Sequence, residues 1–307
     1  TDAYHGDTIG SVSLGFSEPF HTGYEPITFR ALKFAPPYLC APIEGRGDCA
    51  PARLEPAAVA GRRVLERLLA AHAHELAAVV IEPLMQGAAG MWPQTPGFLR
   101  GVRALCDAHD VLLVCDEVAM GFGRTGTMFA VEQAGIAPDI LCVAKGLTGG
   151  YLPVAATLAT EQVFEAFRGP VAEYKALFHG HTYGGNPLGC AAAIANIELF
   201  ERDDTLGRAQ KAAGALERAL EEHVAPLAHA GPVRRIGTMA GFDLLRDVEA
   251  GERFPAHERR AHRAALLARE EGVIVRGLGD TMILMPPLAM PPALVERAVA
   301  ATARAVA

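Results

Sequence analysis

Short apolar runs alternate with amphipathic segments through the first two-thirds of the chain. The runs that read as strands are 78–81, 111–115, 139–144 and 152–158. Helical periodicity lies before and between them, at 55–77 and 97–109. Strands that alternate with helices in this way predict crossover connections and a mainly parallel sheet that is buried on both faces. The predicted fold class is therefore α/β.

The pattern of predicted helices and strands changes near residue 205. Two helices, 186–200 and 205–223, lead into an α+β pattern: strands within 233–245, a helix at 257–271, strands at 273–276 and 282–285, and a closing helix at 291–306. We therefore expect a large domain over residues 1–205 and a smaller C-terminal domain over residues 206–307. The Pro- and Gly-rich stretch 19–56 predicts a long surface connection.

Composition narrows the class of protein. The chain has 307 residues, is 50% hydrophobic and 21% charged, and carries a net charge of −7, which is typical of a soluble globular enzyme. No basic run points to nucleic acid, and no apolar run is long enough to cross a membrane. The six cysteines are scattered without a C-x-x-C pair, so we expect reduced thiols in a reducing, cytoplasmic compartment.

Ionisable side chains follow three of the predicted strands. Glu82, Asp116 and Lys145 each come at or just after the end of an apolar run. A charged residue at a strand end is often no more than the point where the chain reaches solvent. Because ligands bind beyond the carboxyl ends of parallel strands, three such ends together favour a functional site at that edge of the sheet.

Lys145 is the most distinctive of these residues. The chain has four lysines, and the other three, Lys33, Lys175 and Lys211, lie in polar or connecting stretches. A lysine at the mouth of a sheet is expected to be desolvated, which lowers its pKa and lets the neutral amine form a Schiff base with a carbonyl. Pyridoxal phosphate uses such a lysine together with an acid beside its ring nitrogen, for which Asp116 is the candidate.

A phosphate group needs hydroxyls, backbone N–H groups or a helix N-terminus. The segment HTYGGNP at 181–187 leads into a predicted helix, and Thr182 offers both a hydroxyl and an N–H. An ordinary capped helix start would look the same, so this alternative stays open.

Two other patterns carry less weight. The G-x-G-x-x-G match at 121–126 lies too far from the preceding strand, and no strand-ending acid follows at the right spacing, so no nicotinamide cofactor is expected. The histidine pairs at 72/74 and 179/181 have no supporting Cys or Asp cluster. We therefore expect no metal.

Longer motifs resemble those of the class III, fold type I, pyridoxal-phosphate-dependent aminotransferases. They are DEVAMGFGRTG from residue 116, PDILCVAKGLTGGYLP from residue 138 and HGHTYGGNPLGCAAA from residue 179. The resemblance continues from YHGDTIGSVSLG at residue 4 to VIVRGLGDTMILMPPL at residue 273. It implies a transaminase with pyridoxal 5′-phosphate as its cofactor.

The resemblance also implies roles for cofactor-binding residues. Lys145 matches the lysine that holds the cofactor covalently and moves the proton, and Asp116 matches the aspartate on the pyridine nitrogen. Thr182 matches the threonine that reaches the phosphate of the neighbouring subunit's cofactor, with His181 beside it, so a homodimer with shared sites is implied. Glu82 is similar to a further acid near the ring.

Substrate-binding residues follow in the same way. Tyr4 matches a tyrosine near both the cofactor ring and the substrate, and Gly180 matches a glycine that lines the substrate pocket. Arg276 matches the arginine that holds the substrate carboxylate, because a guanidinium fork pairs with a carboxylate in two hydrogen bonds. A solvated strand end is the alternative for Arg276.

Within the class, the motifs resemble most the branch that acts in biotin biosynthesis. That branch transfers an amino group from S-adenosylmethionine, or from lysine in some members, to 8-amino-7-oxononanoate. The alternatives are another class III enzyme, such as an ω-amino acid aminotransferase or an aminomutase, and a non-catalytic homologue. The family's phosphate-binding Gly-Ser loop precedes the region of Tyr4, so we expect an upstream segment that this chain does not include.

Overall fold

The computed structural model describes residues 1–18, 20–41 and 51–307; Cys49 and part of the predicted surface connection lie outside them. A four-stranded sheet is built from β1 (Ala78–Ile81), β4 (Leu112–Asp116), β5 (Ile140–Val143) and β6 (Ala156–Ala159), in that order. The pairs β1–β4 and β4–β5 are parallel, and β6 is antiparallel to β5. The predicted α/β class and mainly parallel sheet are confirmed.

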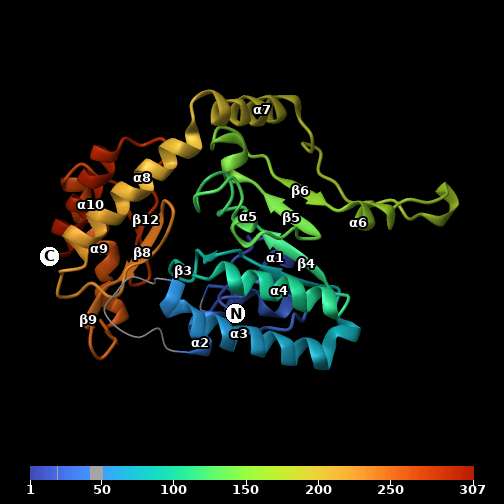
Figure 1. Ribbon diagram of the computed structural model, residues 1–307, viewed down its shortest axis with the longest axis horizontal. Coiled ribbons are helices and arrows are strands. Elements are labelled where there is room, and N and C mark those ends of the chain that lie inside the picture. The colour runs from blue at the N-terminus through green and yellow to red at the C-terminus, as the bar shows by residue number, and fades with distance from the viewer. Residues whose placement is uncertain (19, 42–50) are drawn as a thin grey trace.

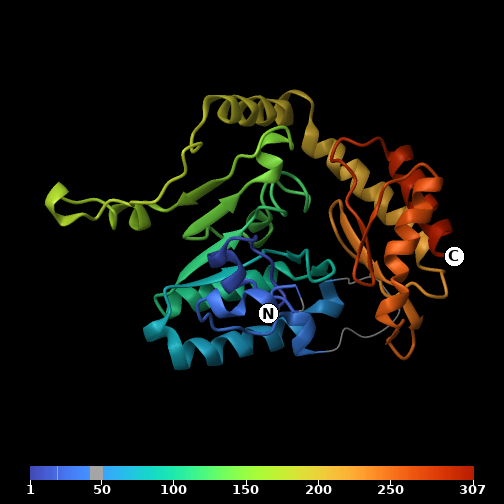
Figure 2. The same ribbon diagram turned by 180° about the vertical axis from the view of Figure 1, so that it is seen from behind.

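Two long helices cover one face of this sheet. Figures 1 and 2 show α3 (Pro51–His72) and α4 (Pro96–Ala108) side by side on the same face. Buried and half-buried residues accordingly alternate along β1 and β4, whereas all residues of β6 are exposed. The expectation of a sheet buried on both faces is therefore wrong for the described residues, because the long helices pack on one side only.

The sequence explains where α4 begins and what it buries. Thr95 is the N-cap, and its hydroxyl accepts the Phe98 N–H at 3.0 Å while Pro96 occupies the first turn. Phe98, Leu99 and Val102 then recur on one helix face and are fully buried in the core that lies under the sheet. This packing fixes the strand ends that carry the candidate site.

The C-terminal part has its own sheet and its own core. The strands β7 (Arg234–Ile236), β8 (Met239–Asp243), β11 (Arg276–Leu278) and β12 (Thr281–Leu284) pair in the order β11-β12-β8-β7, all antiparallel. The helices α8 (Thr205–Ala219), α9 (Arg260–Glu270) and α10 (Pro292–Val306) supply the rest of a separate apolar cluster. The domain boundary near residue 205 stays a prediction, which the two cores support.

One expected strand is misplaced. Residues 273–275 do not form a strand, and β11 begins only at Arg276. Gly272 ends α9 in the left-handed region, at φ +78°, and the Val273 N–H bonds the Ala268 carbonyl. This segment is therefore the C-terminal turn of the helix rather than the start of the strand.

Apart from the helix α7, the remaining elements are short. They are α1 (Ile9–Leu14), η1 (Thr22–Ile27), α2 (Pro37–Cys40), η2 (Ala73–Glu75), β2 (Met85–Gln86), β3 (Trp92–Pro93), α5 (Ala130–Ala134), η3 (Lys145–Thr148), α6 (Glu161–Glu165), η4 (Val171–Glu173), α7 (Pro187–Arg202), η5 (Leu220–Val224), β9 (Leu245–Asp247), β10 (Glu252–Arg253) and η6 (Ala256–Glu258). Between β6 and α7 the chain runs out from the body of the molecule and returns (Figure 1). No helix among the described residues has the length and apolarity to cross a bilayer.

Candidate active site

The carboxyl ends of β1 and β4 hold the two acids expected there. Glu82 directly follows β1 and Asp116 ends β4, and these strands are neighbours in the sheet. The N-terminal segment lies across both ends: the Tyr4 N–H donates to Glu82 Oε1 at 3.1 Å, and His5 Nδ1 lies 2.8 Å from Asp116 Oδ2. The structure therefore brings Tyr4, Glu82 and Asp116 together, as the sequence predicts.

The Asp116 carboxylate is buried, and each of its two oxygens has a partner in the protein. Its side chain meets His5 through Oδ2, and Oδ1 accepts the Val118 N–H at 3.0 Å. Two partners from different segments fix the orientation of the carboxylate. The sequence pattern does not single out His5, although it lies directly beside Tyr4 in the first of the family motifs.

Glu82 is held in an environment that disfavours its charge. It is buried, and desolvation raises the pKa of its carboxyl to about 7 even though the N–H groups of Gly87 and Tyr4 donate to it. The positive charge of a protonated His5 opposes this rise in pKa, and the negative charge of Asp116 adds to it. Glu82 thus changes protonation near neutral pH.

The raised pKa makes stability depend on pH. Glu82 binds its proton more tightly in the folded chain, so its stabilising contribution is complete below about pH 4.5 and is lost as the pH rises through about 7. In cofactor-free protein, Glu82→Gln should therefore reduce the fall in unfolding free energy between pH 5 and pH 8 by about 2–3 kcal/mol. Urea titrations at several pH values across that range measure how steeply the unfolding free energy falls with pH.

A second buried acid, Glu117, serves as the comparison for Glu82. It is fully buried, accepts the Ala130 and Val131 N–H groups at 2.9 Å each, and burial raises its pKa to about 7 as well. Glu117→Gln should flatten the same pH profile without touching Glu82. Equal slopes in the wild type and in Glu82→Gln would contradict the assignment. Sequence reasoning missed Glu117, which anchors α5 beside the site.

Lys145 lies one strand further along the sheet. Cys142 pairs with Asp116, and the chain then turns at Lys145 into η3. Lys145 has φ +40°, in the left-handed region, which costs an ordinary residue about 1–2 kcal/mol. Such backbone strain concentrates at functional sites.

Lys145 is not desolvated as the sequence predicts. Its side chain is exposed among the described residues, because the turn carries it beyond the buried end of β5 and glycines follow it. The lysine amine is therefore open to a ligand rather than enclosed by this chain.

The turn itself is held firmly from α7. Asn196 Nδ2 donates to the carbonyls of Gly146 at 2.8 Å and Leu147 at 3.2 Å. Gly146 also lies against Phe122, where an added Cβ would come within 2.7 Å of the Phe122 Cβ. These contacts fix the backbone that presents Lys145, and sequence reasoning did not identify Asn196.

The other expected residues lie further out. Gly180, His181 and Thr182 are exposed, in the part of the chain that returns toward α7. Asn186, not Thr182, caps α7 by accepting the Gly189 N–H at 2.8 Å. The described residues therefore do not bury Thr182 in the site, and its role toward a neighbouring subunit stays a prediction.

Arg276 begins β11 in the C-terminal sheet and is exposed. Its charge nevertheless reaches the site. Burial and a hydrogen bond from the Tyr4 hydroxyl to Asp7 raise the pKa of Tyr4, and the positive charge of Arg276 opposes this rise. Arg276 thus acts on Tyr4 through its charge, and its role toward a substrate stays a prediction.

The residues present fit a cofactor that carries an aldehyde and a ring that becomes cationic. An accessible amine lies on the strained turn that follows β5, the strand next to the one that ends in a buried, oriented carboxylate. Beside Glu82, the buried Gln86 Oε1 has no hydrogen-bond partner among the described residues. These groups supply a nucleophile, an anion and a spare acceptor at one edge of the sheet.

Comparison with known proteins gives consistent matches. The sequence profile of the family described as aminotransferase class III matches residues 1–306. The chain is 50% identical over 295 residues to an adenosylmethionine-8-amino-7-oxononanoate aminotransferase from Nitratidesulfovibrio vulgaris, covering 94% of this chain and 52% of that protein. An enzyme of the same name from Geobacter sulfurreducens is 47% identical over 290 residues, covering 94% of this chain and 63% of that protein. The chain thus spans about half to two-thirds of the length of these two enzymes.

Solved structures of aminotransferases have the same fold as this chain. The enzyme of that name from Methanocaldococcus jannaschii superposes with a TM-score of 0.90 at 36% identity, over 100% of this chain and 66% of that one. An amine transaminase from an uncultivated Pseudomonas species, solved in its PLP-bound form, gives a TM-score of 0.89 at 33% identity, over 99% of this chain and 68% of that one. The same backbone arrangement is therefore shared by enzymes that carry out amino transfer.

Proposed function

The chain belongs to the class III aminotransferase family, and from this premise we propose that its protein transfers an amino group to 8-amino-7-oxononanoate, giving 7,8-diaminononanoate in biotin biosynthesis. The fold is fold type I of the pyridoxal-phosphate-dependent transferases. The observation that carries the proposal is the 50% identity, over 94% of this chain, to the Nitratidesulfovibrio vulgaris enzyme of that name. S-adenosylmethionine is the proposed amino donor, with lysine as the other candidate.

The cofactor of this family is pyridoxal 5′-phosphate. When bound, it supplies an aldehyde that captures amino groups and a ring that accepts the electron pair of the substrate carbon. Lys145 is proposed to hold it, Asp116 to keep the proton on its ring nitrogen, and Thr182 with His181 to hold the phosphate of the partner's cofactor. Lys145 Nζ, once free, acts as general base and acid at the substrate carbon.

Substrate recognition is proposed to involve the two ends of the site. Arg276 is proposed to bind the substrate carboxylate with its guanidinium fork, because it is an exposed arginine at the start of β11 whose position matches the family's carboxylate-binding arginine. Tyr4 and Gly180 are proposed to flank the substrate. Glu82 accepts the Tyr4 N–H and so orients that tyrosine.

A homodimer is proposed as the working assembly. Large apolar side chains are exposed along and beside the outward-running segment, and Tyr151, Val171, Phe178 and Leu188 are each more than three-quarters exposed. Exposed apolar side chains along one segment favour an interaction site, and a second copy is the proposed partner. We also propose a cytoplasmic location, because each of the five cysteines in the described residues is a free thiol.

Assays on the natural full-length polypeptide test the function. With pyridoxal phosphate and S-adenosylmethionine or lysine, 8-amino-7-oxononanoate should be converted to 7,8-diaminononanoate, detected by mass spectrometry, with a kcat/KM at least about 100-fold above that for other keto or aldehyde acceptors. A preference for acceptors derived from ω-amino acids would replace the proposal with another class III activity. Absence of any pyridoxal spectrum would indicate a non-catalytic homologue.

A further inference from the structure

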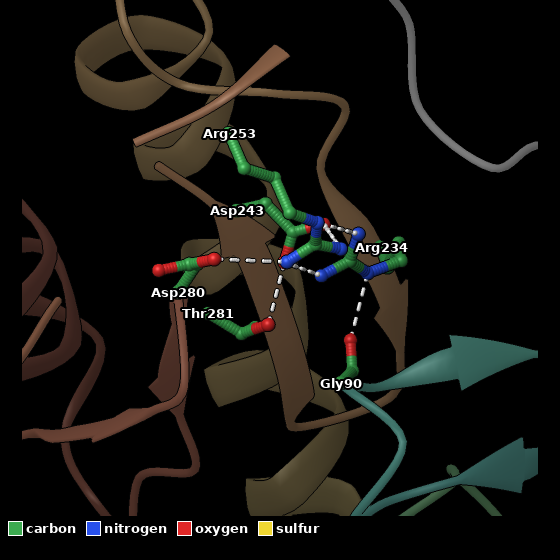
Figure 3. A network of polar contacts seen from close by, with 6 residues as sticks. All are labelled: Gly90, Arg234, Asp243, Arg253, Asp280 and Thr281. Atoms are coloured by element: carbon green, nitrogen blue, oxygen red, sulfur yellow. Dashed lines mark hydrogen bonds and ion pairs between the residues drawn. The ribbon is translucent and has the colours of Figure 1, made fainter. Parts of the chain in front are cut away.

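Arg234 is a buried cation that binds two separate parts of the fold. It lies on β7, is 1% exposed, and pairs with Asp243 through both oxygens, at 2.9 and 2.7 Å. Its Nε donates to the Gly90 carbonyl at 2.7 Å (Figure 3). Its guanidinium also lies 4.3 Å from the ring centroid of Trp92. Gly90 and Trp92 belong to the β2–β3 hairpin, so one side chain joins that hairpin to the C-terminal sheet.

The hairpin and the sheet approach each other very closely at this point. Gly90 has φ +109°, and a Cβ built there would lie 3.1 Å from Thr281 Oγ1 and 3.5 Å from Arg234 Nη2. On the sheet side, a Cβ at Gly241 would lie 3.1 Å from the Cβ of Met91. An added Cβ on either surface would press against its neighbour, so the contact restricts the spacing between the two parts.

On the sheet side, the network leads to the strand of Arg276. Asp243 Oδ1 also accepts the Thr281 hydroxyl at 2.5 Å, and Thr281 is its register partner on β12. Thr281 in turn pairs with Leu278 on β11, the strand that begins at Arg276. The carboxylate that binds Arg234 thus sets the position of the two strands next to it.

On the hairpin side, the network leads to Glu82 and the N-terminal segment. The Gly87 N–H, at the start of the hairpin loop, donates to Glu82 Oε2 at 3.0 Å. Trp92 stacks on Tyr38 with ring centroids 4.5 Å apart, and the Tyr38 hydroxyl donates to Asp2 at 2.8 Å. The same hairpin therefore contacts the acid that orients Tyr4 and the segment that contains it.

We propose that Arg234 is a positioning residue: it fixes the strand of Arg276 relative to Tyr4 and Glu82, and thereby sets recognition of the substrate carboxylate. This inference rests on the proposed function, because it takes Arg276 as the carboxylate anchor. A buried ion pair is by itself weak support for stability, since apolar residues of the same volume often serve as well. The rigid guanidinium fork, in contrast, fixes distances to Asp243 and Gly90 that no apolar side chain reproduces.

The test compares Arg234→Lys with Arg253→Ala in the natural full-length polypeptide loaded with pyridoxal phosphate. Arg253 is a matched control, because it is exposed, lies 3.9 Å from the same Asp243 and bonds Asp280 at 3.1 Å. Both of these carboxylates belong to the C-terminal part of the chain, so Arg253 pairs with them without joining them to the hairpin. The substrates are 8-amino-7-oxononanoate and its methyl ester, which lacks the carboxylate charge.

Arg234→Lys should lower the preference for the acid over the ester by about tenfold, through a higher KM for the acid, and should leave the cofactor spectrum and the ester rate nearly unchanged. Arg276→Ala gives the acid-over-ester preference that is expected when the carboxylate-binding arginine is absent. Arg253→Ala should keep the wild-type preference. In the cofactor-free protein, nonanoate, an unreactive carboxylate, should bind about tenfold more weakly to Arg234→Lys when measured by calorimetry.

Gly90→Ala provides a second variant if Arg234→Lys does not fold. It keeps the Arg234–Asp243 pair and forces the hairpin away from Thr281, so the same loss of acid preference is expected. Equal losses for acid and ester that follow a fall in melting temperature would overturn the positioning role. A wild type without any preference for the acid would instead overturn Arg276 as the anchor, which is a failure of the proposed function.

Discussion

Replacing Lys145 by alanine is expected to abolish amino transfer and to remove the visible absorbance of covalently held pyridoxal phosphate. The Lys145 amine is open to solvent on the strained turn that follows β5, the strand that pairs with the strand of Asp116. Without it, the protein loses both the nucleophile that holds the cofactor and the base that moves the proton. Turnover should fall by at least about 10³-fold, measured by product formation and by absorbance spectra.

Another lysine supplies the control. Lys211 lies on α8, away from the strand ends, so Lys211→Ala should keep the spectrum and the rate. A small primary amine added to Lys145→Ala should restore part of the activity, since it replaces the missing base without restoring the covalent link. Wild-type turnover in Lys145→Ala would refute the assignment of the site.

Asp116→Asn is expected to lower kcat by about three orders of magnitude while the protein stays folded. At a separation of about 4 Å and an effective dielectric near 20, a carboxylate stabilises a ring cation by about 4 kcal/mol, and the neutral amide loses most of this. That energy corresponds to about a 10³-fold change in rate. The asparagine is nearly the same size, so the contacts of His5 and Val118 are disturbed far less than the charge.

Steady-state kinetics together with circular dichroism and thermal unfolding measure this result. Asp107→Asn is the control, because Asp107 pairs with Arg103 on the outer surface of α4 and has no place in the site. A rate within about tenfold of wild type in Asp116→Asn would show that Asp116 does not face the ring nitrogen. A large loss of folding in that variant would point to a structural role instead.

Sequence patterns predict the parts of the site that depend on regular structure. Glu82 and Asp116 are found where expected, because burial of Val79, Ile81, Leu113 and Cys115 fixes where each strand ends. The parallel order of β1 and β4 then brings both ends to one edge. Local hydrophobic pattern is sufficient for this much of the geometry.

The rest of the site geometry depends on contacts between segments that are far apart in the chain. His5 meets Asp116, and Asn196 holds the turn of Lys145, yet neither pair has a signal in local periodicity. The β2 and β3 strands are too short to show alternation, so the sequence does not predict the hairpin that Arg234 holds. The exposure of Lys145 also follows from how a turn leaves the sheet, which apolar patterning does not encode.

The tight approach at Gly90 has a consequence for how this sequence can evolve. A side chain at Gly90 would be strained by its positive φ and would press against Thr281. A smaller residue at position 281, or a shift of the strand that carries it, would relieve the second of these, and moving that strand shifts the partners of Arg234. Substitutions in the hairpin and in β12 are therefore energetically coupled rather than independent. The two segments are expected to diverge together, so that change in one lineage at Gly90 is accompanied by compensating change at Thr281.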